Sequence, residues 1–377
     1  MTLSPAMPVM PVSPALAAAL AASCATLPET GGGDEALPSA QAGPFRAIAQ
    51  AELGNSRGAP YVMDDNDALT RDPSVVDLDG DPGTLASAGF FAATLHAEGA
   101  PADPSAPPNA IVRHDAFDGR SFDRSPVTVL EPAAAWEGGT VGAPSAILAG
   151  GEIWLYYAAA GGVGLARSPD GLAFTREPAP VLAPAPGGWE RGAVPASPGV
   201  VALPDGSLRM FYEVAGEGGA ASIGEARSID GLVWERVGDG PALAPSLAPA
   251  GSGASDVDDV EEPYDSLAVG DPAPVLATSA TGRAALRLYH AARDRSGRAV
   301  IGLAARFADG EPFERAVASV FGAASSLGPR APCVLVYPER SLLFATQRAG
   351  SSGAQSYPAV AAGVAPGNAQ LPPPDPL

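Results

Sequence analysis

Few side chains of this 377-residue chain could take part in chemistry, and most of them carry a carboxyl group. Asp72 and Asp271 each stand directly before a proline that opens an apolar run, in DPSVV and DPAPVL. Glu213 lies in MFYEV, and Glu261 and Glu262 lie in DVEEPYDS. Carboxyl groups can transfer protons, accept hydrogen bonds from hydroxyl groups or bind cations. Which of them act together depends on the elements that carry them.

Imidazole and metal chemistry have less support. His290, in LYHAAR, could hydrogen-bond a ligand or bind a cation, and a histidine packed within a strand is the alternative. An acidic run could hold a structural Ca²⁺, but its spacing does not follow the EF-hand pattern, and a solvated loop is the alternative. The run consists of Asp256, Asp258, Asp259, Glu261 and Glu262. Three His and two Cys disfavour a zinc enzyme. We expect no other cofactor.

The carboxylates belong to a repeat. A proline followed by apolar residues recurs five times, in DPSVV, APSAI, SPGVV, DPAPVL and APCVL, at intervals of 54 to 74 residues. We number the units 1 to 5 by their marker prolines, which are Pro73, Pro144, Pro198, Pro272 and Pro332. We call the residue before each proline the lead residue. The five lead residues are Asp72, Ala143, Ser197, Asp271 and Ala331.

A second motif recurs near the end of the units. GLARSPDGLAF (164–174) and GEARSIDGLVW (224–234) are nearly identical, so that Asp118, Asp170 and Asp230 fall at one repeat position, with Asp309 in a weaker copy. An Asp-Gly pair between apolar runs predicts a tight turn. We interpret this motif as architecture. The aromatic residues that follow it are expected to pack between units, and they are Phe122, Phe174, Trp234 and Phe313.

Each unit contains about four strand-like runs separated by turns. Gly (45) and Pro (41) are abundant, as in proteins built from many short strands. Four antiparallel strands repeated at this period are typical of a β-propeller blade, which buries its faces only against neighbouring blades. We therefore predict an all-β fold, a five-bladed β-propeller of four-stranded antiparallel blades, over residues 59–365.

The pattern W-E, P-S-V, L-Y-Y, I-G-x-A-x-S-x-D-G and P-V-L-x-P resembles the five-bladed propeller glycoside hydrolases of the arabinanase/β-xylosidase and invertase/levansucrase families. The resemblance implies a site in the axial funnel, where two carboxyl groups flank a glycosidic bond at roughly 5–10 Å from each other. It implies Asp72 as general base, Asp271 as auxiliary carboxylate, and Glu213, Glu261 or Glu262 as general acid. The expected ligand-binding residues are His290 with Trp136 and Trp189 of the W-E pairs.

Three of the five lead residues are not Asp, which favours a protein that binds a glycan or oligosaccharide without catalysis. Two alternatives remain open: an active glycoside hydrolase or transferase that uses Asp72, and a cell-surface propeller that binds another protein. The chain has 22 Lys and Arg against 42 Asp and Glu, a net charge of −20, which disfavours nucleic-acid binding. We expect a monomer.

The N-terminus resembles a bacterial lipoprotein signal, with an apolar run from Ala15 to Ala22 before Ser23 and Cys24. The resemblance implies export to the periplasm or cell surface and membrane attachment through a lipid on Cys24. Residues 1–14 lack Lys and Arg, and an unstructured tail is the alternative. We predict a signal peptide at 1–24, a tether at 25–58 and a disordered tail at 366–377.

Overall fold

The computed structural model describes residues 43–47, 71–78, 88–94, 106–115, 126–246, 262–278, 284–316, 318–322, 328–336, 341–349 and 357–365. This part of the chain consists of strands and turns, with two short 3₁₀ helices (Ala135–Glu137 and Glu217–Gly219) and no α-helix. It contains no helix long and apolar enough to cross a membrane. The prediction of an all-β protein is confirmed.

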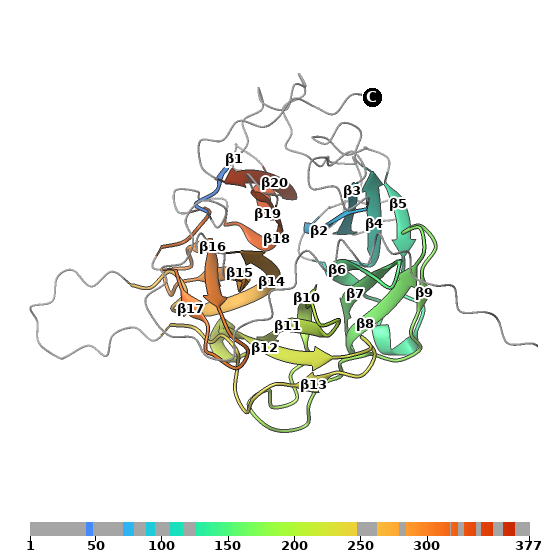
Figure 1. Cartoon of the computed structure of the whole chain (residues 1–377), viewed down its shortest axis with the longest axis horizontal. Coiled ribbons are helices and arrows are strands. Elements are labelled where there is room, and N and C mark those ends of the chain that lie inside the picture. Colours follow the sequence, from blue (N-terminus) through green and yellow to red (C-terminus); the bar gives the residue numbers. More distant parts are fainter. Residues whose placement is uncertain are drawn as a thin grey trace, which may run out of the picture.

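The strands form sheets that surround a central axis (Figure 1). One sheet contains β2 (Arg71–Asp77), β3 (Ala88–Thr94), β4 (Ala110–Asp115) and β5 (Val127–Leu130). The next contains β6 (Gly142–Ala149), β7 (Glu152–Ala159), β8 (Gly162–Ser168) and β9 (Thr175–Arg176). In each sheet the first strand lies nearest the axis, and consecutive strands pair antiparallel.

A larger, eight-stranded sheet covers units 3 and 4. Its first half contains β10 (Ala196–Ala202), β11 (Leu208–Ala215), β12 (Ala221–Ser228) and β13 (Glu235–Arg236). Its second half contains β14 (Ala268–Thr278), β15 (Ala284–Arg293), β16 (Ala299–Arg306) and β17 (Glu314–Arg315). A single parallel pair, Ala221 with Ala268, joins the halves. Hydrogen bonding therefore groups the described strands into four sheets, where the repeat predicts five.

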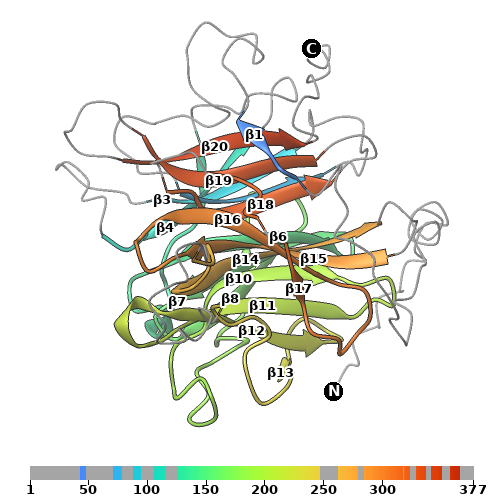
Figure 2. The same ribbon diagram turned by 90° about the vertical axis from the view of Figure 1, so that its left-hand side faces the viewer.

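The last sheet uses both ends of the described chain. It contains β18 (Arg330–Val336), β19 (Ser341–Ala349), β20 (Tyr357–Ala365) and β1 (Arg46–Ala47). Strand β1 lies beside β20, with Arg46 opposite Val364 (Figure 2). Phe45 is buried, and its ring meets that of Tyr289 edge to face at 5.9 Å. The tether predicted at 25–58 therefore includes a segment that belongs to this sheet.

Aromatic rings pack between successive units as the repeat predicts. In each case a ring on the second strand of one unit meets, edge to face, the ring that follows the Asp-Gly turn of the next. The pairs are Phe91–Phe174, Tyr156–Trp234 and Phe211–Phe313, with centroids 6.0, 5.8 and 5.7 Å apart. Such contacts add to the free energy gained by burying the rings. Phe122 and Asp118 lie outside the described residues.

The repeated Asp-Gly motif is a hydrogen-bonded turn. The Asp170 carboxylate accepts bonds from the Ser168 hydroxyl at 2.9 Å and from the backbone N–H of Leu172 and Ala173 at 2.9 and 3.2 Å. The copy at 228–233 repeats this set of bonds around Asp230. The motif therefore builds the fold, as we interpreted it from the sequence.

The Trp-Glu pairs also build the fold. Glu137 is fully buried and accepts hydrogen bonds from the Tyr157 hydroxyl at 2.7 Å and the Arg176 guanidinium at 3.0 Å. We call this arrangement of a buried Glu bonded by a Tyr and an Arg a clamp. It recurs in the next unit, where Glu190 accepts from the Tyr212 hydroxyl at 2.6 Å and from the Arg236 guanidinium at 2.7 Å. The two residues of β9 and β13 therefore include an arginine that ties the end of each unit to its beginning.

Candidate functional site

All five lead residues lie within the innermost strands and have positive φ, between 42° and 53°. Residues other than glycine rarely adopt this conformation, and a following proline disfavours the α region further. The register between first and second strands shifts at this point in every unit, between Arg71 and Ser74 in unit 1 for example. Each lead residue is therefore part of a β-bulge inside a strand, a feature that can redirect a side chain. Asp72 and Asp271 therefore lie inside strands and not in turns ahead of them.

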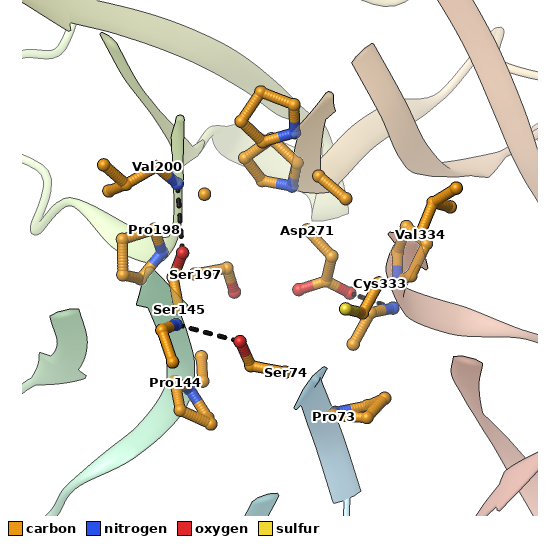
Figure 3. Close-up of a pocket in the computed structure, with 18 of the residues that line it drawn as sticks. Pro73, Ser74, Pro144, Ser145, Ser197, Pro198, Val200, Asp271, Cys333 and Val334 are labelled. Atoms are coloured by element: carbon orange, nitrogen blue, oxygen red, sulfur yellow. Dashed lines mark hydrogen bonds between the residues drawn. The ribbon is translucent and has the colours of Figure 1, made fainter. Parts of the chain in front are cut away.

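The five bulges meet at an axial pocket of about 240 Å³. Residues 72–75, 143–146, 197–201, 271–276 and 331–335 line it, from β2, β6, β10, β14 and β18 (Figure 3). Small and apolar residues make up most of the wall. Asp72 and Asp271 are the charged residues among its described lining. Figure 3 shows the Asp271 carboxylate directed into the pocket, toward Ser197.

One dipeptide of β18 connects the two aspartates. The Arg330 guanidinium lies 3.8 Å from the Asp72 carboxylate, and the backbone N–H of Ala331 donates to Asp271 Oδ2 at 3.1 Å. The backbone N–H of Asp72 donates a hydrogen bond to the Thr346 hydroxyl at 2.8 Å. The carboxylates of units 1 and 4, both predicted from the sequence, therefore contact adjacent residues of β18.

The third predicted carboxyl group, that of Glu213 on β11, joins this cluster from behind the wall. Its Oε2 accepts a hydrogen bond from the backbone N–H of Asp271 at 3.0 Å. Burial, with repulsion from Asp271, raises the pKa of Glu213 to about 7. Burial also raises the pKa of Asp72 above its usual value, an effect that Arg330 opposes and Asp271 reinforces. Asp72 in the wall and Glu213 behind it therefore keep their protons at a higher pH than exposed carboxyl groups do.

Other predicted residues lie away from the pocket wall. His290 on β15 is fully buried, and its Nδ1 is 3.2 Å from the carbonyl oxygen of Leu288. Burial lowers the pKa of His290 to about 4, so the ring is neutral at pH 7. Glu262 is exposed and accepts a hydrogen bond from the Ser266 hydroxyl at 2.6 Å. His290 is therefore packed within its strand, which was the alternative to its binding a ligand or a cation.

Trp136 and Trp189 also do not line the pocket. The Trp136 ring stacks on Tyr157 with centroids 6.0 Å apart, and Trp189 packs against the buried cluster that contains Tyr212 and Trp234. Their expected role in binding a ligand in the axial pocket is therefore corrected to packing. Glu261, Cys24 and the run Asp256, Asp258 and Asp259 lie outside the described residues. Within the described residues, no group of three or more His, Cys, Asp or Glu could hold a metal ion.

Side chains not singled out from the sequence tie neighbouring inner strands together. The Ser74 hydroxyl accepts from Ala146 N–H at 2.9 Å, the Ser145 hydroxyl accepts from Val200 N–H at 3.0 Å, and Cys333 Sγ accepts from Val75 N–H at 3.3 Å. All three side chains stand two residues after a lead residue. Comparing this position between the units could have identified them from the sequence. Thr346 and Arg330 carried no such signal.

Solved structures similar to this one include several glycoside hydrolases. A thermostable family-43 glycoside hydrolase matches with a TM-score of 0.55 at 15% identity, over 85% of this chain and 99% of the other. The catalytic domain of the GH62 α-L-arabinofuranosidase of Coprinopsis cinerea matches with 0.58 at 13%, over 88% and 98%. A family 117 glycoside hydrolase of Zobellia galactanivorans matches with 0.56 at 14%, over 87% and 91%.

These similarities confirm the resemblance to the propeller glycoside hydrolases at the level of the fold, in a divergent sequence. No protein-family model matches the chain, and no curated sequence is similar to it.

Proposed function

We propose that this protein is a five-bladed, glycosidase-like propeller that binds a carbohydrate in its axial pocket through Asp72 and Asp271. One observation supports this most: five equivalent bulges converge on one pocket, and its wall carries two carboxylates that contact the same dipeptide. Carboxylates are strong acceptors for sugar hydroxyl groups. The five-blade count rests on the five inner strands and on the single pair that joins the halves of the eight-stranded sheet.

The test is binding of neutral oligosaccharides to the full chain by titration calorimetry. Because the similar structures include arabinofuranosidases, an endo-arabinase and a complex with cellotriose, the panel is arabinotriose, xylotriose and cellotriose. We expect the preferred trisaccharide to bind, and Asp72→Asn or Asp271→Asn to weaken that binding at least tenfold. Glu262→Gln, an exposed residue outside the pocket, is the control. Absence of binding for all three sugars would rule out the proposal.

Hydrolysis of a glycosidic bond is a second candidate, favoured by the pKa of Glu213 at about 7. A carboxyl group that is still protonated near neutral pH can act as a general acid, and Asp72 would be the general base. Release of reducing sugar from arabinan or xylan, lost in both Asp72→Asn and Glu213→Gln, would establish this activity. If the unmodified protein binds sugar but releases no reducing sugar from these polysaccharides, only the binding function is supported.

Export and attachment to a membrane through a lipid on Cys24 remain part of the proposal. They depend on the N-terminal sequence, which lies outside the described residues. In a bacterial host, a Cys24→Ser variant should leave the membrane fraction. Unchanged partitioning of the variant would contradict lipidation.

A further inference from the structure

The backbone N–H groups of the lead residues are not bonded alike. In unit 4 the Asp271 N–H donates to Glu213 Oε2, and in unit 1 the Asp72 N–H donates to the Thr346 hydroxyl. Glu213 and Thr346 are equivalent, because each lies on a second strand opposite the residue before a lead residue. In unit 5 the acceptor for Ala331 is Asp271 Oδ2. An N–H group at this position is therefore within reach of a carboxylate that projects into the pocket.

Units 2 and 3 lack such acceptors. The positions equivalent to Glu213 and Thr346 in the preceding units are alanines, Ala93 and Ala158. Strand pairing skips the lead residue in both units, from Gly142 to Ser145 and from Ala196 to Gly199. Among the described residues, no side-chain acceptor binds the N–H of Ala143 or Ser197. These lead residues share the positive φ and the register shift of the other three, so the bulge has the same form in all five units.

We propose that the N–H groups of Ala143 and Ser197, with the Ser197 hydroxyl, form a donor wall that binds oxygen atoms of a neutral sugar unit. An acceptor wall is formed by Asp72 and Asp271 of the flanking units 1 and 4, and Figure 3 shows the Asp271 carboxylate directed toward Ser197. A sugar hydroxyl both donates and accepts, so a polyol satisfies both walls at once. The pocket carboxylates and the net charge of −20 disfavour an anionic sugar. This inference rests on the proposed function and specifies its ligand class.

Two variants test the donor wall. Ala158→Thr places a hydroxyl where Thr346 stands in unit 5 and should occupy the Ser197 N–H. Ser197→Ala removes the hydroxyl donor. Each change should weaken binding of the preferred trisaccharide about tenfold, the effect of one lost hydrogen bond of roughly 1.4 kcal/mol. The matched control is Ala291→Thr, at the same strand position in unit 4, because the next lead residue, Ala331, already has Asp271 as its acceptor.

Calorimetry with arabinotriose, xylotriose, cellotriose and trigalacturonate separates the outcomes. The inference is supported if Ala158→Thr and Ser197→Ala weaken binding while Ala291→Thr stays within about twofold of the unmodified protein. It is overturned, with the proposed function intact, if both variants bind like the control or if trigalacturonate binds more tightly than every neutral sugar. If the unmodified protein binds no sugar, both proposals fail. Thermal melting shows whether Ala158→Thr is folded. If it is not, the effect of Ser197→Ala on binding decides whether the inference stands.

Discussion

The Glu213 carboxylate accepts a hydrogen bond from the backbone N–H of Asp271 at 3.0 Å, 58 residues further along the chain. Both residues are acidic, so this bond holds two carboxyl groups near each other. The Asp271 carboxylate in turn binds the N–H of Ala331. The chain of contacts connects three successive units at the pocket and places a protonatable group directly behind its wall.

Glu213→Gln should change how stability depends on pH. Because the folded-state pKa of Glu213 is raised from 4.5 to about 7, its contribution to stability is present below pH 4.5 and is lost as pH rises to about 7. The amide oxygen of Gln can still accept the Asp271 N–H but does not ionise. Relative to the unmodified protein, the variant should therefore gain about 1–3 kcal/mol in unfolding free energy between these pH values.

Urea unfolding at several pH values between 4 and 8 measures this gain. Glu262→Gln removes an exposed carboxylate and should show no comparable change. A Glu213→Gln difference that stays constant from pH 4.5 to 7, or that favours the unmodified protein at higher pH, would contradict the raised pKa.

Tyr212→Phe should destabilise the fold through the clamp at Glu190. The Tyr212 hydroxyl donates to this buried carboxylate at 2.6 Å, and hydrogen bonds to charged groups contribute about 1.5–3 kcal/mol. Tyr156→Phe is the matched control, because its hydroxyl donates to a neutral carbonyl, that of Gly231, at 3.2 Å. Chemical unfolding should give a larger loss for Tyr212→Phe. Equal losses would mean that the buried charge adds nothing.

Trp234→Ala should show how much the aromatic contacts between units contribute to the stability of the fold. The Trp234 ring packs on Tyr156, and its indole N–H donates to the Gly231 carbonyl at 3.0 Å. Removing a buried tryptophan costs about 3–5 kcal/mol. Val233→Ala, at a neighbouring side chain that is 74% exposed, should cost less than about 0.5 kcal/mol. Thermal unfolding of both variants makes the comparison, and similar melting temperatures would refute the packing role of Trp234.

Gly199→Ala should disturb the junction between units 3 and 4. A Cβ at Gly199 would lie 2.1 Å from the Pro272 carbonyl oxygen, which is backbone and cannot move aside cheaply. We expect a loss of about 1–3 kcal/mol in unfolding free energy. Gly187→Ala meets no atom within 4 Å and is the control. If both glycine variants unfold at the same denaturant concentration, the inner strands are less tightly packed than described.

Most of the fold could be predicted from the repeat. The marker prolines stand at the bulges of the inner strands, where a residue without an N–H group costs no ladder hydrogen bond. The Asp-Gly turns and the aromatic contacts between units follow from spacing alone. The position of β1 could not be predicted this way, because its two residues carry no repeat signal and pair with a strand more than 300 residues away.

The site was only partly predictable. Asp72, Asp271 and Glu213 were identified, because two precede marker prolines and the third lies near the end of a strand. The rule that a residue before proline is extended cannot predict the positive φ of the lead residues. His290 occupies the strand position of Tyr157 and Tyr212, each opposite a glycine, so comparing the units would have placed it in the core. Thr346 reaches Asp72 only through the closure of the ring.

The central claim, that the axial pocket binds a neutral sugar, is tested most directly by a crystal structure with the preferred trisaccharide. We predict one sugar unit in the pocket, with hydroxyl groups within about 3.2 Å of the Asp72 and Asp271 carboxylates and an oxygen within that distance of the Ser197 hydroxyl. A trisaccharide bound elsewhere on the protein, with the pocket free of sugar, would contradict it.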